Sequence, residues 1–134
     1  MEVVEPIYVL DTHALLWHLV ADKKLSTRAT NIFDAADRGE TQLVVSVIVL
    51  AELYHLNQKR QSPLNFTEVF NDLVNSPAYQ LVPFEPGHVL DFPQDAAVTE
   101  LHDRIIAGLA RRLDAPLISM DPVIQAADVA RIEW

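Results

Sequence analysis

The sequence contains no cysteine among its 134 residues. Disulfides, thiolate zinc sites and cysteine nucleophiles are therefore excluded, and a reducing cytoplasm is the compartment we expect. The first six residues have neither the basic start nor the long apolar core of a signal peptide. No apolar run approaches the ~20 residues that a membrane-spanning helix needs. Together these absences predict a soluble, cytoplasmic protein with no membrane segment.

Glycine and basic residues are also scarce. The chain has three glycines and neither a Gly-x-Gly-x-x-Gly nor a Gly-Lys-Ser/Thr motif, which argues against dinucleotide-binding and P-loop folds. Ten Lys and Arg against 19 Asp and Glu give a formal net charge of -9, which argues against a broadly basic surface for nucleic acid or membrane. Nucleic acid is not excluded, because a metal held by carboxylates reverses the local sign of charge. The acidity also suits a basic protein partner.

Half of the residues are hydrophobic, so we expect one domain over residues 1–134 with a core of its own. Apolar runs of β-formers alternate with segments at helical spacing. This alternation predicts an α/β fold with a central parallel sheet of about four to five strands flanked by helices. Strands are expected at 7–10, 43–46, 79–84, 117–119 and 131–133, and helices at 12–19, 26–38, 47–56, 65–75, 86–90, 100–113 and 122–127.

Three details of this prediction concern the helices and one loop. The helix at 47–56 is expected to end in the polar connection 57–63, and residues 92–99 carry no interpretable pattern. The helices at 65–75 and 100–113 should turn apolar stripes toward the core. The stripes comprise Phe66, Val69, Phe70, Leu73 and Val74 in one helix, and Leu101, Ile105, Ile106, Leu109 and Leu113 in the other.

Four acidic residues stand out by their positions. Asp11 and Asp121 come just after buried strands, whose carboxyl ends share one edge of a parallel sheet. Glu52 and Asp103 lie at the margins of the apolar stripes of their helices, from where a side chain can reach the same edge. We therefore expect these four carboxylates to lie close together.

Carboxylates brought together repel each other unless a cation lies between them. An oxygen-only ligand set favours Mg²⁺ or Mn²⁺ over zinc. Such a site can activate water for in-line attack on a phosphodiester and neutralise the leaving oxygen, so no histidine base is needed. A histidine zinc site is disfavoured, because the five histidines include no His-Glu-x-x-His pair.

Each acid also has an ordinary structural interpretation. Asp11 and Asp121 can cap helices, and Asp121 precedes Pro122, which is a common helix start. Glu52 and Asp103 can be solvated charges, and Glu100 with Arg104 can form an i, i+4 pair. These alternatives stay open residue by residue, although caps alone explain two strand-end aspartates in so small a chain less well than a shared site does.

Four segments together resemble the motifs of PIN-domain ribonucleases, and most of all the VapC-like toxins of bacterial toxin–antitoxin pairs. The resemblance spans essentially the whole chain, including the closing residues 131–134. Many relatives carry Asp-Pro-Phe-Asp-Arg where this chain has Glu-Leu-His-Asp-Arg at 100–104. The matching segments are Tyr8 to Trp17, Leu50 to Leu53, His102 to Ala107 and Leu117 to Asp121.

The resemblance implies a metal-dependent endoribonuclease that uses Mg²⁺ or Mn²⁺. Thr12 and Ser119 match small hydroxyl residues that orient a carboxylate or a bound water. Arg104 matches an arginine that contacts phosphate or pairs with a carboxylate, and Glu100 keeps the acidic character of its position. The residues that match the acidic metal-binding and catalytic positions are Asp11, Glu52, Asp103 and Asp121.

The resemblance also implies partners: an RNA substrate, a second copy of the chain in a homodimer, and a cognate VapB-like antitoxin whose tail covers the site. A PIN-fold module that has lost catalysis and only binds RNA or protein is the main alternative. A haloacid-dehalogenase-like phosphatase would need an aspartate where this chain has His13, and a receiver domain would need a lysine later than Lys59. Trp17 and Tyr54 are expected in packing or in the dimer interface rather than on RNA bases.

Overall fold

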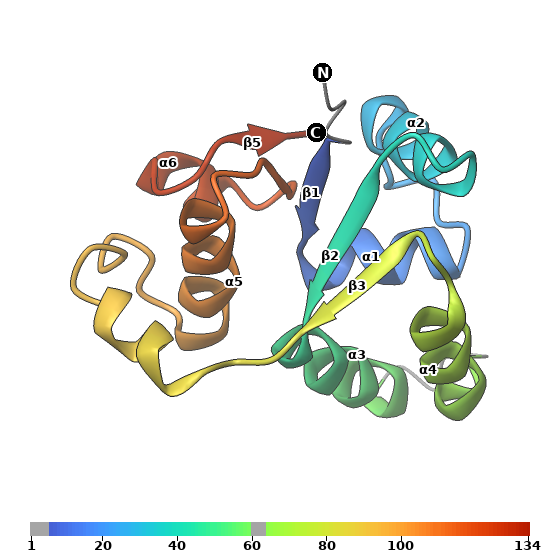
Figure 1. Cartoon of the computed structure of the whole chain (residues 1–134), viewed down its shortest axis with the longest axis horizontal. Helices are drawn as coiled ribbons and strands as arrows, with labels where there is room; N and C mark the ends of the chain where they lie inside the picture. Colours follow the sequence, from blue (N-terminus) through green and yellow to red (C-terminus); the bar gives the residue numbers. More distant parts are fainter. Residues whose placement is uncertain (1–5, 60–63) are drawn as a thin grey trace, which may run out of the picture.

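The computed structural model describes residues 6–59 and 64–134. Its centre is a five-stranded, fully parallel sheet in the order β3-β2-β1-β4-β5, so the predicted α/β fold is confirmed (Figure 1). The start of the chain at residues 1–5 and the part of the expected connection at 60–63 lie outside the described residues. The strands are β1 (Ile7–Leu10), β2 (Gln42–Ser46), β3 (Tyr79–Val82), β4 (Leu117–Ile118) and β5 (Ile132–Glu133).

Helices flank this sheet, with α1 passing behind β2 and β3 and α5 lying beside β1 in the view of Figure 1. Within residues 6–59 and 64–134, no helix combines the length and the apolar character needed to cross a bilayer. The helices are α1 (Thr12–Leu19), α2 (Thr27–Asp37), α3 (Val47–Lys59), α4 (Phe66–Asn75), the 3-10 helix η1 (Pro86–Asp91), α5 (Leu101–Arg112) and α6 (Pro122–Ala127).

β1 is the central strand and fixes where the acids meet. Val9 lies opposite Val44 of β2 on one side and opposite Leu117 of β4 on the other, and all three side chains are buried. Burial on both faces explains why these strands read as continuous apolar runs. Because every strand is parallel, the ends of β1 and β4 lie at the same edge of the sheet, with Asp11 and Asp121 just beyond them.

Side-chain caps set the starts of several helices close to the predicted positions. Ser26 accepts from the Ala29 N–H at the start of α2, and Asn65 accepts from the Glu68 N–H at the start of α4. These bonds satisfy backbone donors that the first turn leaves free. After α2, Gly39 adopts a φ of +77°, a conformation that glycine takes at little cost and that commonly ends helices.

Two predictions about the helices were wrong. α3 runs past Leu56 to Lys59, because Asn57 is buried and its amide donates to the Leu64 carbonyl, so this polar residue belongs to the helix rather than to a connection. In α4 only Leu73 is fully buried, whereas Phe70 and Val74 are 41% and 51% exposed. The apolar stripe of α4 is wider than the surface of β3 and α3 that covers it. Leu101 and Leu113, at the two ends of the predicted α5 stripe, are likewise exposed.

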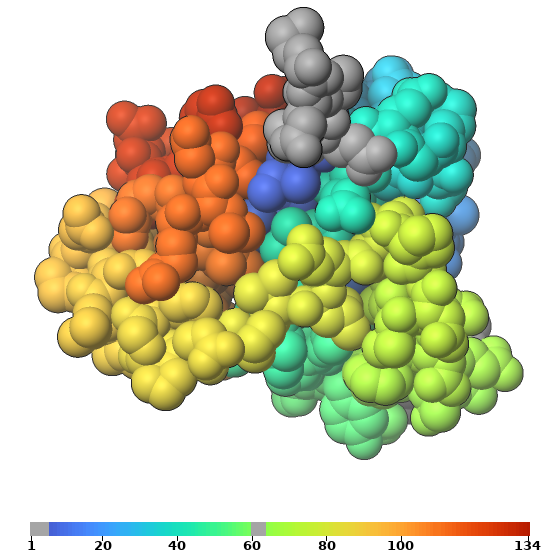
Figure 2. Space-filling model, viewed as in Figure 1, coloured from blue at the N-terminus to red at the C-terminus, as the bar shows by residue number. Residues whose placement is uncertain are grey.

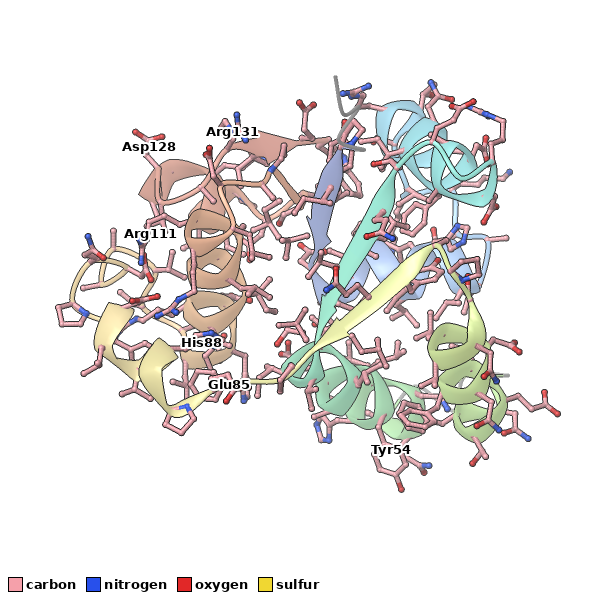
Figure 3. The ribbon with its side chains drawn as sticks, viewed as in Figure 1. Tyr54, Glu85, His88, Arg111, Asp128 and Arg131 are labelled. Carbon is pink, nitrogen blue, oxygen red and sulfur yellow. The ribbon has the colours of Figure 1, made fainter. Side chains whose placement is uncertain are left out.

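Residues 84–99 pack against α5, and Figure 2 shows this yellow and amber segment lying on the orange helix. The predicted helix at 86–90 is present as η1, whereas residues 92–99, whose sequence carries no interpretable pattern, continue the contact without regular structure of their own. A buried ion pair holds the two together: Arg111 donates to both carboxylate oxygens of Asp95 at 2.6 and 3.2 Å, and Asp95 is 1% exposed. Figure 3 shows Arg111 on the side of α5 that faces this segment. Arg112 pairs with Asp91 beside it, so the contact includes two arginines of one helix.

Candidate active site

A cavity of about 500 Å³ lies at the carboxyl edge of the sheet, where β1 and β4 end. Trp17 and Met120 form part of its wall, beside a set of carboxylates drawn from four separate parts of the chain. All four acids that the sequence singled out line this cavity, together with a fifth. The five are Asp11, Glu52, Glu100, Asp103 and Asp121.

Asp11 is the most enclosed of these acids, at 7% exposed. Its Oδ1 accepts a 2.8 Å hydrogen bond from the Ala14 N–H, so it caps α1 as well as facing the cavity. Burial raises the pKa of its carboxyl, against the opposing effects of hydrogen bonds from Ser119 and Ala14. Capping and membership of the acidic cavity are therefore compatible, and the cap fixes the orientation of the side chain.

Ser119 links the two strand-end aspartates. Its hydroxyl bonds to the Asp11 carboxylate and accepts a 3.1 Å hydrogen bond from the Asp121 N–H, and its side chain is fully buried. Asp121 in turn caps α6, since its Oδ1 accepts from the Val123 N–H at 2.8 Å. A single buried hydroxyl thus ties the ends of β1 and β4 together.

Glu52 reaches the cavity from α3 and is held by the start of α1. The Thr12 hydroxyl donates a 2.7 Å hydrogen bond to Glu52 Oε1. Thr12 is itself 4% exposed, so this donor has little freedom to turn elsewhere. The Glu52 side chain is therefore held in place at the wall of the cavity and is not a freely solvated charge on α3.

Asp103 and Glu100 come from the start of α5. Glu100 caps the helix, because its Oε2 accepts from the Asp103 N–H at 2.7 Å. The pKa of Asp103 rises to about 6, first through burial and then through the negative charges of Glu100, Asp121, Glu52 and Asp11. The negative charge of every other acid in the cavity therefore repels the charged form of Asp103. Such repulsion is expected where carboxylates lie close together.

His102 is a member of this site that the sequence reasoning missed. Its Nδ1 lies 3.2 Å from Glu100 Oε1 and 3.5 Å from Glu52 Oε2, so one imidazole joins the acids of α3 and α5. The available signal was its place inside the segment 100–104, immediately before Asp103. Histidines were considered in the sequence only as pairs at metal-binding spacing. Such a pattern does not reveal a contact between one histidine and carboxylates on another helix.

Arg104, in contrast, is not brought to the acids. Its Nε donates to the Val98 carbonyl at 2.7 Å, and its guanidinium lies 5.6 Å from the centre of the Phe92 ring. It lines a separate, smaller cavity between α5 and η1. The Arg104 side chain therefore acts as a contact between α5 and residues 92–98. It does not line the acidic cavity, and among the described residues no ion pair joins it to a carboxylate of that cavity.

The donor set suits a hard divalent cation, because carboxylate oxygens dominate the cavity and no thiolate is available. Within residues 6–59 and 64–134, no three acidic or histidine side chains stand in an arrangement that would hold an ion between them. Mg²⁺ commonly uses only one or two carboxylates and completes its shell with water and phosphate oxygens. The residues best placed for that role are Asp11, Asp103 and Asp121, with Glu52 beside them.

A family model described as PIN domain matches residues 8–130 of the sequence. The chain belongs to the PIN domain family. The match takes in every residue of the acidic cavity, from Asp11 to Asp121. A comparison with curated proteins finds no significant match.

Solved structures similar to this PIN domain include two VapBC structures and FitAcB. VapBC from Salmonella typhimurium, solved bound to DNA, has a TM-score of 0.70 at 17% identity, over 96% of this chain and 97% of that chain. VapBC2 from Rickettsia felis, solved with a DNA fragment from its promoter, has a TM-score of 0.66 at 19% identity, over 95% and 97%. FitAcB from Neisseria gonorrhoeae has a TM-score of 0.63 at 21% identity, over 94% and 96%. At these identities the likeness is one of fold.

Proposed function

We propose that the protein is a metal-dependent endoribonuclease that hydrolyses RNA phosphodiester bonds, acting as the VapC-like toxin of a toxin–antitoxin pair. The observation that carries this proposal is the shared cavity: Asp11, Glu52, Asp103 and Asp121 come from separate elements and line one space. Membership of the PIN domain family supports the same activity. Mg²⁺ or Mn²⁺ is the proposed cofactor, because hard cations prefer oxygen ligands.

The roles of this chain's residues follow from their hydrogen bonds. Asp11 and Asp121, oriented by Ser119 and by their caps, are the proposed ligands nearest the sheet. Asp103 from α5 and Glu52 from α3 are further ligands or bind a water in the same cavity, with Thr12 fixing Glu52. A bound divalent ion would supply positive charge at the scissile phosphate and lower the pKa of a water molecule.

The proposed partners follow from the same assignment. VapBC and FitAB are the kinds of assembly found among the similar structures, which supports a VapB-like antitoxin as partner in the cytoplasm. A homodimer is proposed as well. Exposed apolar side chains on α3 and α4, Tyr54, Phe70 and Val74, offer a surface on which a second chain can pack. Sedimentation analysis of the purified protein tests the dimer.

A PIN module that binds RNA or protein without cutting is the competing proposal. Retention of all four acids in one cavity favours catalysis over it, because a binding surface for phosphate gains nothing from gathered negative charge. Activity measurement separates the two directly.

The test is cleavage of a mixed pool of structured and single-stranded RNA by purified protein, with Mg²⁺, with Mn²⁺ and with chelator. Asp11→Asn is the decisive variant, because asparagine also caps helices and keeps α1 in place while it removes the charge. Asp72→Asn makes the same change at an exposed position on α4 and serves as the matched control. We expect metal-dependent cutting by the wild type and the control, and none by Asp11→Asn. Cutting by Asp11→Asn at the wild-type rate would refute the assignment.

A further inference from the structure

A second cavity, of about 280 Å³, adjoins the acidic one and shares Glu52 and His13 with it. It lies between the starts of α1 and α5 and one face of α3. The α3 side supplies Ile48, Ala51 and Leu56, so its wall is largely apolar. If a phosphate of the substrate lies among the carboxylates, the adjoining part of the substrate strand lies next to this second cavity.

Three imidazoles surround this apolar wall, each from a different helix: His13 from α1, His55 from α3 and His102 from α5. His55 follows Ile48 and Ala51 at intervals of seven and four, which places all three on one face of α3. Tyr54, the residue before His55, projects away from the sheet (Figure 3) and packs edge-on against Phe66 instead. The chain therefore directs an imidazole, and not the larger aromatic ring, into the cavity.

The walls of the two cavities carry negative charge and few groups that can donate a hydrogen bond to RNA, so these imidazoles are its main side-chain donors there. Among the described residues that line either cavity, none is Lys or Arg, and the indole nitrogen of Trp17 is buried, so the exposed nitrogen donors on the side chains come from histidine. Five of the described arginines already pair with a carboxylate elsewhere. The sixth, Arg104, is bound to the Val98 carbonyl. RNA that enters either cavity therefore meets imidazole rings and no Lys or Arg among the described lining residues.

We infer that the second cavity binds the nucleoside next to the scissile phosphate of a single-stranded RNA. The base lies against Ile48 and Leu56, and His55 stacks on it or donates to its edge. This inference rests on the proposed function, since it names the substrate form that the same site takes. Imidazole is among the rings on which unstacked RNA bases are held, and bases are accessible in this way only in single strands. A cavity just under ~300 Å³ is at the small end of ligand sites and suits one nucleoside rather than a duplex.

The test uses the whole protein in chelator, so that binding is observed without cleavage. Proton signals of the five histidine rings are followed by NMR while a ribotrinucleotide is added at millimolar concentration, and each signal is assigned from a His→Ala variant. We expect a saturable shift of the His55 signal with the trinucleotide and none with ribose 5-phosphate, which lacks a base. His55→Ala should weaken binding of the trinucleotide about tenfold. His88→Ala, which removes an imidazole from η1 outside both cavities, should change it less than about twofold.

The outcomes separate this inference from the proposed function. A His55 signal that does not move, in a protein that cuts RNA when metal is supplied, overturns the nucleoside site and leaves the nuclease intact. A His55 signal that moves, in a protein that cuts nothing, supports nucleoside binding and argues against the nuclease. A shift caused by a basic peptide and not by the trinucleotide overturns the inference and assigns the cavity to a protein partner.

Discussion

The hydroxyl of Thr12 and the carboxylate of Glu52 are joined by a 2.7 Å hydrogen bond across 40 residues of sequence. It directly links the strand-end segment that carries Asp11 to the helix that carries Glu52. Carboxylates that bind metal depend on such partners for their orientation, and loss of the partner typically lowers metal affinity about 10- to 100-fold.

Thr12→Val should therefore weaken Mn²⁺ binding by about tenfold while the fold survives, because valine keeps the shape of threonine and removes only the donor. Thr12→Ser keeps a hydroxyl and should bind Mn²⁺ within about twofold of the wild type. Isothermal titration of the apo proteins with Mn²⁺ measures both. Equal affinities in the Thr12→Val variant and the wild type would show that the orientation of Glu52 does not matter for the metal.

The raised pKa of Asp103, about 6 against an ordinary value of 3.8, predicts a pH-dependent change in stability. The folded state holds this proton more tightly than the unfolded state, so its stabilising contribution is complete below pH ~4 and is lost as the pH rises through ~6. Above that pH the charged Asp103 carboxylate destabilises the folded state, and Asp103→Asn removes this cost because asparagine carries no charge. In chelator the variant should exceed the wild type by ~1 kcal/mol in free energy of unfolding at pH ~7.5, a value reduced for solvent screening of a half-buried group.

At pH ~4 the Asp103→Asn variant and the wild type should unfold at nearly the same urea concentration, because the penalty of a charged Asp103 is then largely absent from the folded wild-type chain. Asp72→Asn serves again as the control and should show little difference at either pH. An Asp103→Asn variant that is no more stable than the wild type at the higher pH would contradict the crowding of charge in the cavity.

The buried pair of Asp95 and Arg111 predicts a large loss of stability on truncation. Asp95 is 1% exposed and bonded to the guanidinium through both oxygens, so Asp95→Ala leaves Arg111 without its main partner. We expect a loss of ~2 kcal/mol in urea denaturation, less than for a pair with both partners buried, because the Arg111 side chain is 30% exposed and keeps Asp91 at 3.6 Å. Glu40→Ala breaks the exposed pair with Arg38 and should leave the urea midpoint almost unchanged. Similar losses in the two variants would show that burial adds nothing to the Asp95 pair.

Gly108 makes a separate prediction about the same contact. A Cβ at this position would lie 2.6 Å from Asp95 Oδ2, and that side chain cannot yield because Arg111 holds it. Gly108→Ala should therefore cost ~2 kcal/mol through overpacking, despite the better helix propensity of alanine. Gly87→Ala, where a Cβ meets nothing within 4 Å, is the matched control and should be close to neutral. A neutral Gly108→Ala in thermal unfolding would mean that α5 shifts freely against residues 84–99.

Much of the fold could be predicted because its signals are local. Continuous apolar runs marked the buried parallel strands, and helical spacing placed the starts of two helices at residues 26 and 65, which cap α2 and α4 in the structure. Asp11 and Asp121 stood out for the same reason, since a carboxylate directly after a buried strand is visible in the sequence itself. Their placement beside one cavity needed only the rule that parallel strands end at a shared edge.

The remainder depends on contacts that the sequence does not encode locally. Periodicity located the apolar face of α4, but it carried no information on whether a neighbour covers Phe70 and Val74, which are exposed. The pairing of Asp95 with Arg111 joins an irregular segment to a helix sixteen residues later. The contacts of His102 with Glu52 likewise depend on how α3 packs against α5, which is a property of the assembled fold.

The order in which the acids occur along the chain has a consequence for synthesis. Asp11 and Glu52 are translated early, whereas Asp103 and Asp121 follow much later, and Asp121 reaches the cavity only when β4 pairs with β1. A nascent chain that contains only the first two acids therefore still lacks three of the five acids that line the cavity. The complete cavity therefore forms only after β4 has left the ribosome, and a chain that ends before that strand lacks Asp121 and one of the two strands that pair with β1.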